Sequence, residues 1–223
     1  MELNADFSKR AAVHAGRLAW VPSPTEGVER RMLDRIGDEV ARATSIVRYA
    51  PGSRFPAHTH GGGEEFLVLE GVFQDEHGNH PVGSYVRNPP TSRHVPGSVP
   101  GCVIFVKLRQ FHPDDRTHLR IDTNRMSFRL LPARPGVEIL PLHRDDREDV
   151  RLERWAAGAR IELDAIGGLE ILVLDGSFHE AGDEFIRQSW LRLPAGATLR
   201  ADAGSQGCRV WVKTGHLAAP SHT

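Results

Sequence analysis

The chain contains an internal repeat, and this repeat limits the folds that it can adopt more than any other feature. Residues 64–73 read EEFLVLEGVF, and residues 169–178 read LEILVLDGSF. Residues 101–107 and 207–213 likewise read GCVIFVK and GCRVWVK. The two pairs are offset by 105 and 106 residues, which indicates a duplicated unit of about that length. We therefore expect two units of the same fold, packed together.

Each unit has the pattern of an all-β protein. Short runs rich in β-branched residues recur between turns that use many of the 22 glycines and 15 prolines. Almost no segment keeps a helical period over three turns, which favours a sandwich or barrel of antiparallel strands. The polar segment 111–122 marks the junction, so we assign residues 1–115 to the first unit and 116–223 to the second. We expect strands over residues 39–50, 57–60, 65–70, 84–87 and 102–108.

The segment PGSRFPAHTHGGGEEFLVLEG contains the candidate metal site. Residues two apart on a strand point to the same face, so His58 and His60 project together. Imidazoles paired in this way are typical ligands of a borderline divalent metal. The three glycines that follow permit a tight turn, which can bring Glu64 to the same ion. His94 is the candidate for a fourth ligand.

The spacing of these residues matches the two motifs of the cupins. The first motif, G-x5-H-x-H-x3-E-x6-G, is complete from Gly52 to Gly71. The second, G-x5-P-x-G-x2-H-x3-N, keeps its first glycine, its proline and the histidine at position 94. It departs at Thr91 and Ser98, which replace the glycine and the asparagine. These departures affect turn geometry more than metal binding.

We therefore expect one divalent metal ion per chain, with zinc or iron as the first candidates and nickel or manganese as further ones. Imidazole-rich sites accept all of these metals, so the residues alone do not choose among them. Strand alternation lets only one of two neighbouring glutamates face inward, and the motif spacing favours Glu64. Glu65 is then expected near the site without binding the metal, or at the surface. The predicted ligands are His58, His60, Glu64 and His94.

The second unit keeps the strand and turn pattern but lacks these ligands. An alignment through the glycine turns places Asp164 and Ile166 at the positions of the H-x-H pair. It places Leu169 and Leu199 at the positions of the glutamate and the last histidine. Leucine and isoleucine cannot bind a cation, and one aspartate makes a poor site. We expect this unit to be structural, or to form a pocket without metal.

Charge and cysteine content exclude several classes of function. The 28 basic and 29 acidic residues nearly cancel, so we expect neither nucleic acid nor a membrane as a partner. No apolar run of membrane-spanning length and no leader pattern occurs, which makes a cytoplasmic protein the expectation. Cys102 and Cys208 lie in apolar runs without companion ligands, so both are expected as small buried hydrophobes.

The first unit resembles the ChrR-like cupins, the sensor half of anti-sigma factors that restrain an extracytoplasmic-function sigma factor. The run RATSIVRYAPGSRFPAHTHGGGEEFLVLEG, with GSYVRNPP, His94 and GCVIFVK, underlies this resemblance. It implies a double-stranded β-helix, or jelly roll, in each unit, and hence a bicupin. It also implies zinc or another divalent metal on the four residues named above, and cupins commonly form homodimers through edge strands.

One difference from that family concerns binding of a sigma factor. Anti-sigma activity there belongs to an N-terminal helical zinc domain with an H-x3-C-x2-C motif, which this sequence does not contain. We therefore do not expect this chain to bind a sigma factor directly.

Three functions remain open from the sequence. A sensor or regulatory cupin would respond to a small molecule or oxidant at the metal. A non-haem metal-dependent dioxygenase would act on a small diketone or hydroxyketone, using positions that the protein leaves open on the metal. A structural cupin would use the metal only to stabilise the fold. About half of Arg48, Tyr49, Tyr85 and Arg87 are expected to point into the barrel, although any one arginine is more often at the surface.

Overall fold

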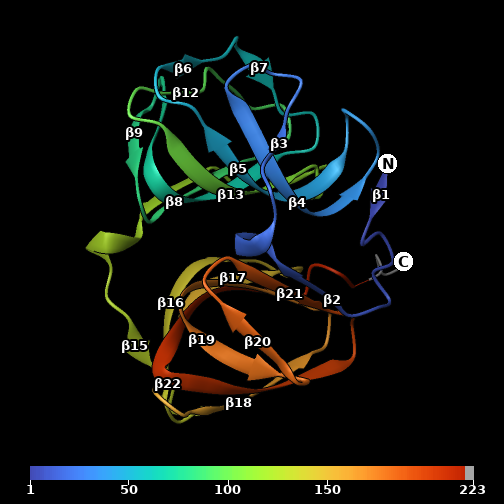
Figure 1. Ribbon diagram of the computed structural model, residues 1–223, viewed down its shortest axis with the longest axis vertical. Coiled ribbons are helices and arrows are strands. Elements are labelled where there is room, and N and C mark those ends of the chain that lie inside the picture. The colour runs from blue at the N-terminus through green and yellow to red at the C-terminus, as the bar shows by residue number, and fades with distance from the viewer. Residues whose placement is uncertain (219–223) are drawn as a thin grey trace. The chain divides into compact units, whose positions relative to one another are not determined.

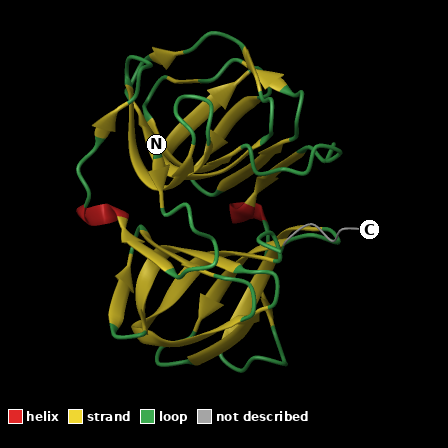
Figure 2. Cartoon of the chain, turned by 90° about the vertical axis from the view of Figure 1, so that its right-hand side faces the viewer, coloured by secondary structure: helices red, strands yellow, loops and turns green. Residues whose placement is uncertain are grey.

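The computed structural model describes residues 1–218, which form strands, turns and two 3-10 helices but no α-helix (Figure 2). Neither helical turn in this range has the length or apolar character needed to cross a bilayer. The chain divides into two compact units. Unit 1 contains Met1–Ala5 and Leu18–Met126, and unit 2 contains Asp6–Arg17 and the chain from Ser127 onward.

Unit 1 is a β-sandwich in which a large sheet faces a set of short strands. The large sheet has the order β1-β4-β5-β13-β8-β10-β14, and all of these neighbours are antiparallel. Its strands are β1 (Glu2–Leu3), β3 (Val21–Pro22), β4 (Val28–Ile36), β5 (Arg42–Tyr49), β8 (Glu64–Asp75), β10 (Ser84–Asn88), β13 (Cys102–Leu108) and β14 (Leu119–Asp122). The short strands are β6 (Ser53–Arg54), β7 (His58–Thr59), β9 (Gly78–Pro81), β11 (Arg93–His94) and β12 (Gly97–Ser98), and the helix η2 (Thr123–Arg125) follows β14.

Unit 2 repeats this arrangement in the order β15-β16-β17-β22-β19-β21-β2. In addition, β18 pairs with β22, and β20 pairs with β19. Its elements are β2 (Ala11–His14), η1 (Ala15–Arg17), β15 (Arg129–Leu130), β16 (Val137–Arg144), β17 (Asp149–Trp155), β18 (Arg160–Ala165), β19 (Leu169–Glu180), β20 (Asp183–Ile186), β21 (Ser189–Leu193) and β22 (Ala197–Thr214). The all-β, tandem cupin fold predicted from the repeat is thus confirmed.

One long strand of unit 2 corresponds to three strands of unit 1. β22 runs unbroken over 18 residues, whereas the matching part of unit 1 is divided into β11, β12 and β13. Pro96 and Pro100 lie in the breaks, at the places of Ala201 and Gln206. A proline has no N–H to donate to a ladder, so these two residues interrupt the strand. The break leaves β11 free to form a separate two-stranded ribbon with β7.

One strand of each sequence repeat belongs to the sheet of the other repeat: β2, which lies beside β21 in Figure 1, and β14. β2 lies in the first sequence repeat but pairs with β21 of the second, with Val13 opposite Trp190. β14 lies in the second sequence repeat but pairs with β10 of the first, with Ile121 opposite Tyr85. Tyr85 and Trp190 are equivalent residues of the two repeats, so the exchange is reciprocal. The division at residues 115 and 116 therefore describes the sequence repeats, and the compact units differ from it by these exchanged segments.

Each unit has its own apolar core, made by alternate residues of facing strands. In unit 1 the core contains Phe66, Val68, Phe73, Val86, Cys102, Ile104 and Val106. The larger core of unit 2 includes Leu169, Ile171, Val173, Phe178, Phe185 and Val212. Both cysteines are buried, as predicted, and burial raises the pKa of Cys102 to about 11 and that of Cys208 to about 12. The thiols therefore stay protonated at neutral pH and act as small apolar side chains.

Candidate metal centre

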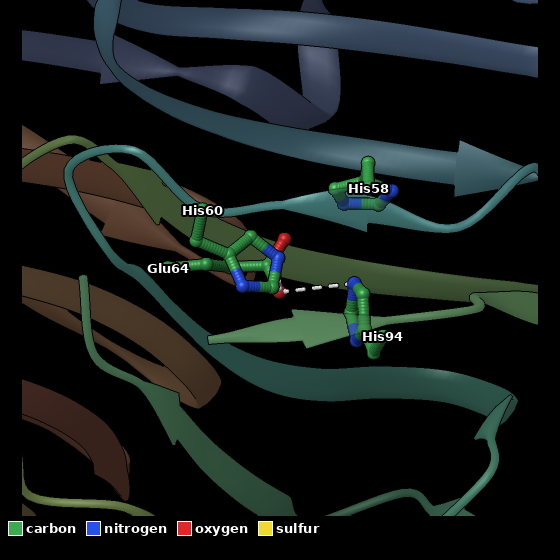
Figure 3. Close-up of side chains that lie close together, drawn as sticks. All are labelled: His58, His60, Glu64 and His94. Carbon is green, nitrogen blue, oxygen red and sulfur yellow. Dashed lines mark ion pairs between the residues drawn. The ribbon is translucent and has the colours of Figure 1, made fainter. Parts of the chain in front are cut away.

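The four predicted ligands lie close together in unit 1 (Figure 3). His58 lies on β7, opposite His94 on β11, in the two-stranded ribbon that these strands form. His60 follows β7 by one residue, and Glu64 begins β8. Each of the four offers a nitrogen or oxygen atom, and these atoms all lie within 4.8 Å of one another. The H-x-H spacing and the turn back to Glu64 therefore produce a cluster that can hold one metal ion.

The turn between His60 and Glu64 depends on glycine. A Cβ atom on Gly63 would lie 2.4 Å from the ring of Phe111, and Gly63 has a φ of 79° that other residues rarely adopt. A Cβ atom on Gly62 would lie 2.9 Å from the backbone of Arg109. This close packing holds the turn against residues 109–111 and so fixes Glu64 relative to the two histidines.

The carboxylate of Glu64 lies at the centre of the cluster. Its Oε2 atom is 3.4 Å from Nε2 of His60 and 3.6 Å from Nε2 of His94. Asn88 donates a hydrogen bond of 3.1 Å to the same oxygen and orients it. Both Nε2 atoms are buried and have no hydrogen-bond partner among the described residues. Lone pairs of two neutral imidazoles facing a carboxylate are a costly arrangement unless a cation lies between them.

The outer nitrogens of two histidines define their tautomers. Nδ1 of His58 lies 3.4 Å from the carbonyl oxygen of Pro56, which can only accept a hydrogen bond. Nδ1 of His60 lies 3.0 Å from Oγ of Ser92, whose own proton is donated to the Pro89 carbonyl. Both imidazoles therefore donate through Nδ1–H, which leaves the lone pair on Nε2. A neutral imidazole with a free Nε2 is the form that binds a metal.

Burial and neighbouring charges shift the pKa values of the buried histidines in opposite directions. Burial lowers the pKa of His60 below its ordinary value, against the attraction of Glu64. Burial also acts to lower the pKa of His94, but Asp75 and Glu64 outweigh it and raise the pKa above its ordinary value. Nδ1 of His94 lies 3.7 Å from Oδ2 of Asp75. The donor set thus meets the test for a divalent cation: three imidazoles, one carboxylate and two buried nitrogens without partners.

Three of the four side chains of the cluster are buried, and the fourth is exposed. His60, Glu64 and His94 are 6%, 7% and 2% exposed, whereas His58 is exposed to solvent. An ion bound here would therefore be reachable from the side of His58.

Glu65 is neither at the surface nor near the metal site, contrary to the sequence interpretation. It is 2% exposed and points to the opposite face of β8, where it accepts a hydrogen bond of 2.6 Å from Tyr85. Arg87 is 1% exposed on this face and forms an ion pair with Asp115. The sequence suggested Arg48, Tyr49, Tyr85 and Arg87 as residues that could point into the barrel. Of these, strand register places Tyr49 on the face of the sheet that carries the metal site.

The alignment of the second unit requires a correction. Leu163 pairs with Leu199 in unit 2 just as His58 pairs with His94 in unit 1, an offset of 105 residues throughout. The positions of the H-x-H pair are therefore Leu163 and Ala165, because the residue that unit 2 lacks is missing before Leu163 and not in the glycine turn. Asp164 and Ile166, which the sequence alignment placed there, are exposed, Ile166 by 86%.

The corrected alignment fills the metal position of unit 2 with apolar side chains. Ala165, Leu169 and Leu199 are each fully buried in the core, and Leu163 packs against it. The residues that contact the ligands in unit 1 are replaced as well, with Leu193 at the place of Asn88. Unit 2 thus lacks not only the ligands but also the polar groups around them. Sequence reasoning missed those groups, because Asn88, Ser92 and Asp75 belong to no motif.

The fold and the donor set define the class: a bicupin with a candidate metal centre in its first half. Residues 8–112 and 116–218 both match the ChrR cupin-like domain, so the chain belongs to that family. No curated protein matches the sequence.

Solved structures confirm the fold. A putative dioxygenase from Nostoc punctiforme superimposes with a TM-score of 0.74 and 15% identity, covering 99% of this chain and 84% of that one. A putative glyoxylate-induced protein from Pseudomonas aeruginosa gives 0.75 and 14%, covering 96% and 91%. The pirin YhhW from Escherichia coli, in complex with nickel(II), gives 0.63 and 16%, covering 93% and 99%. At these identities the likeness concerns the fold alone.

Proposed function

We propose that this chain is a metal-binding regulatory cupin, in which His58, His60, Glu64 and His94 hold one divalent ion and a small molecule or oxidant binds on its open side. Zinc or iron is the proposed metal. When bound, the metal supplies an electrophilic centre with vacant positions. The protein holds the three imidazoles as Nε2 donors, keeps water from the buried side and leaves access beside His58.

The exposure of His58 is the observation that supports this proposal most. A purely structural metal is enclosed by its ligands, whereas this cluster has one ligand in contact with solvent. The regulatory interpretation rests further on membership of the ChrR cupin-like family. A ligand or oxidant at the metal would shift the β7–β11 ribbon, because that ribbon contributes two of the four donors and is joined to the sheet only through short connections.

A non-haem dioxygenase that acts on a diketone or hydroxyketone is the second candidate. The same open side favours it, since such an enzyme needs room for dioxygen and a chelating substrate next to the ion. The fold likeness to a putative dioxygenase is compatible with this candidate.

Two measurements on one preparation separate these functions. Protein loaded with Fe(II) is assayed for dioxygen uptake with a panel of diketones and hydroxyketones, with His60→Ala as the inactive control. The same Fe(II)-loaded protein, without ketone, is followed by hydrogen exchange before and after addition of hydrogen peroxide, which oxidises bound Fe(II) to Fe(III). The regulatory proposal predicts no uptake above the control and faster exchange in residues 58–60 and 93–94 after oxidation. Turnover of any ketone would favour the dioxygenase instead.

Metal affinity is expected to fall as the pH is lowered through neutrality. A proton competes with the metal for the Nε2 lone pair, and the raised pKa of His94 makes this competition begin above the ordinary histidine pKa of about 6.5. The lowered pKa of His60 delays its own protonation to lower pH. Affinity should therefore decline about tenfold per pH unit at first and more steeply below. Zinc affinity measured by chelator competition from pH 8 to pH 5 tests this, and a flat profile would contradict histidine ligation.

A further inference from the structure

A second carboxylate and a fourth histidine lie behind His94, on the side away from Glu64. Asp75 ends β8, and His80 lies opposite Phe73 on β9. The side chain of Asp75 is fully buried, and His80 is 7% exposed. Nε2 of His80 lies 2.9 Å from Oδ1 of Asp75, and the other carboxylate oxygen faces Nδ1 of His94 at 3.7 Å. The three side chains thus form a buried row that ends at the candidate metal centre.

Two atoms in this row lack partners, and they face each other. Oδ2 of Asp75 and Nδ1 of His94 are both buried without a hydrogen bond among the described residues. Oδ1 of Asp75, in contrast, receives two hydrogen bonds of 2.9 Å, one from His80 and one from the backbone N–H of His77. These donors fix the carboxylate so that its free oxygen points to His94. A shift of less than 1 Å would complete an N–H···O bond between them.

Unit 2 provides an internal comparison, because it has the same strands without ligands. Register places Phe185 at the position of His80 and Glu180 at the position of Asp75. Glu180 does not face a histidine there; it accepts hydrogen bonds of 2.7 and 3.0 Å from Arg10. The carboxylate–histidine pair therefore occurs only in the unit that has the candidate ligands. A residue pair needed for folding of the β8–β9 hairpin would be expected in both units.

We infer that Asp75, held in place by His80, is a positioning residue for His94: it keeps the proton on Nδ1 and directs the Nε2 lone pair to the metal. Carboxylates that accept a hydrogen bond from a ligating imidazole orient the ring and increase its basicity. This inference rests on the proposed metal site.

The test measures zinc affinity and stability without metal in four variants. Asp75→Asn replaces the acceptor by an amide of the same shape, and removing such a partner lowers affinity about 10- to 100-fold. His80→Phe copies unit 2 and should lower affinity as well, whereas His80→Gln retains an N–H donor and should restore it. Glu180→Gln is the matched control in unit 2 and should leave affinity unchanged. Zinc is titrated against a chromophoric chelator, and thermal unfolding is recorded without metal.

The outcomes separate this inference from the proposal on which it depends. Lower affinity in Asp75→Asn and His80→Phe, with His80→Gln near the parent protein, would support it. Parent-like affinity in Asp75→Asn would overturn it, even if that variant were less stable, because the pair would then serve the fold alone. Failure of the unaltered protein to bind zinc would overturn the proposed metal site and this inference together.

Discussion

The variant His60→Ala is expected to lose tight metal binding. His60 supplies a buried Nε2 atom 3.4 Å from the Glu64 carboxylate, and the cluster contains no further histidine among the described residues. Four-ligand zinc sites contribute about 10–16 kcal/mol, so loss of one ligand costs on the order of 3 kcal/mol, or more than about 100-fold in affinity. Chelator competition measures the affinity, and inductively coupled plasma analysis measures the bound metal.

The control for this variant is Asp164→Ala in unit 2. Sequence alignment places Asp164 at a ligand position, whereas the structure places it on the surface. Its replacement should leave both metal content and affinity unchanged. Metal should also raise the melting temperature of the unaltered protein but not of His60→Ala, because a ligand at 100 times its Kd stabilises the folded state by about 2.7 kcal/mol. A His60→Ala protein that retains one equivalent of metal would exclude this histidine as a ligand.

Disruption of β2 is expected to destabilise unit 2, and disruption of β14 is expected to destabilise unit 1. Each strand thus matters for the sheet of the other sequence repeat. Replacing Ala12 and Val13 together with proline breaks β2, and replacing Arg120 and Ile121 together breaks β14. Alternate N–H groups of an edge strand face its neighbour, so two adjacent prolines remove at least one ladder hydrogen bond. Each double variant should lose on the order of 2–3 kcal/mol of stability in the unit that contains the broken strand.

Hydrogen exchange by mass spectrometry reads out the two units separately. The β2 variant should speed exchange in Ser189–Leu193 and leave metal affinity unchanged, although it alters the first sequence repeat. The β14 variant should speed exchange in Ser84–Asn88 and weaken metal binding, since Asn88 at the end of that strand orients Glu64. If the β2 variant instead loosened Ser84–Asn88, each strand would belong to its own sequence repeat.

Much of the fold could be predicted from the sequence, because the repeat and the strand pattern are local properties. The strand at Cys102–Leu108 begins and ends where the apolar run does, and the glycine turns divide the others nearly as expected. The exchange of β2 and β14 could not be predicted. Both are four-residue edge strands, and their sequences contain nothing that distinguishes pairing with one copy of the repeat from pairing with the other.

The ligands of the candidate site follow from motif spacing, but their surroundings do not. Asp75 reaches His94 only because β8 is 12 residues long and returns through β9, which is a property of the folded hairpin. The assignment of Asp164 and Ile166 to the H-x-H positions is wrong because one residue is missing before Leu163, where no motif marks the gap. The burial of Arg87 could not be predicted from the sequence. The pattern of its strand does not show that the outer face is buried, where Arg87 lies beside Glu65 and Asp115.

The metal content of the intact, untagged protein tests the central claim most directly. Unit 1 brings three imidazoles and a carboxylate together, whereas unit 2 fills the same positions with Leu163, Ala165, Leu169 and Leu199. Elemental analysis after dialysis against zinc and removal of loosely bound ions should therefore give one equivalent per chain. The Leu169→Ala variant should give the same value. Zero equivalents, or two, would contradict a single metal centre in the first half of the chain.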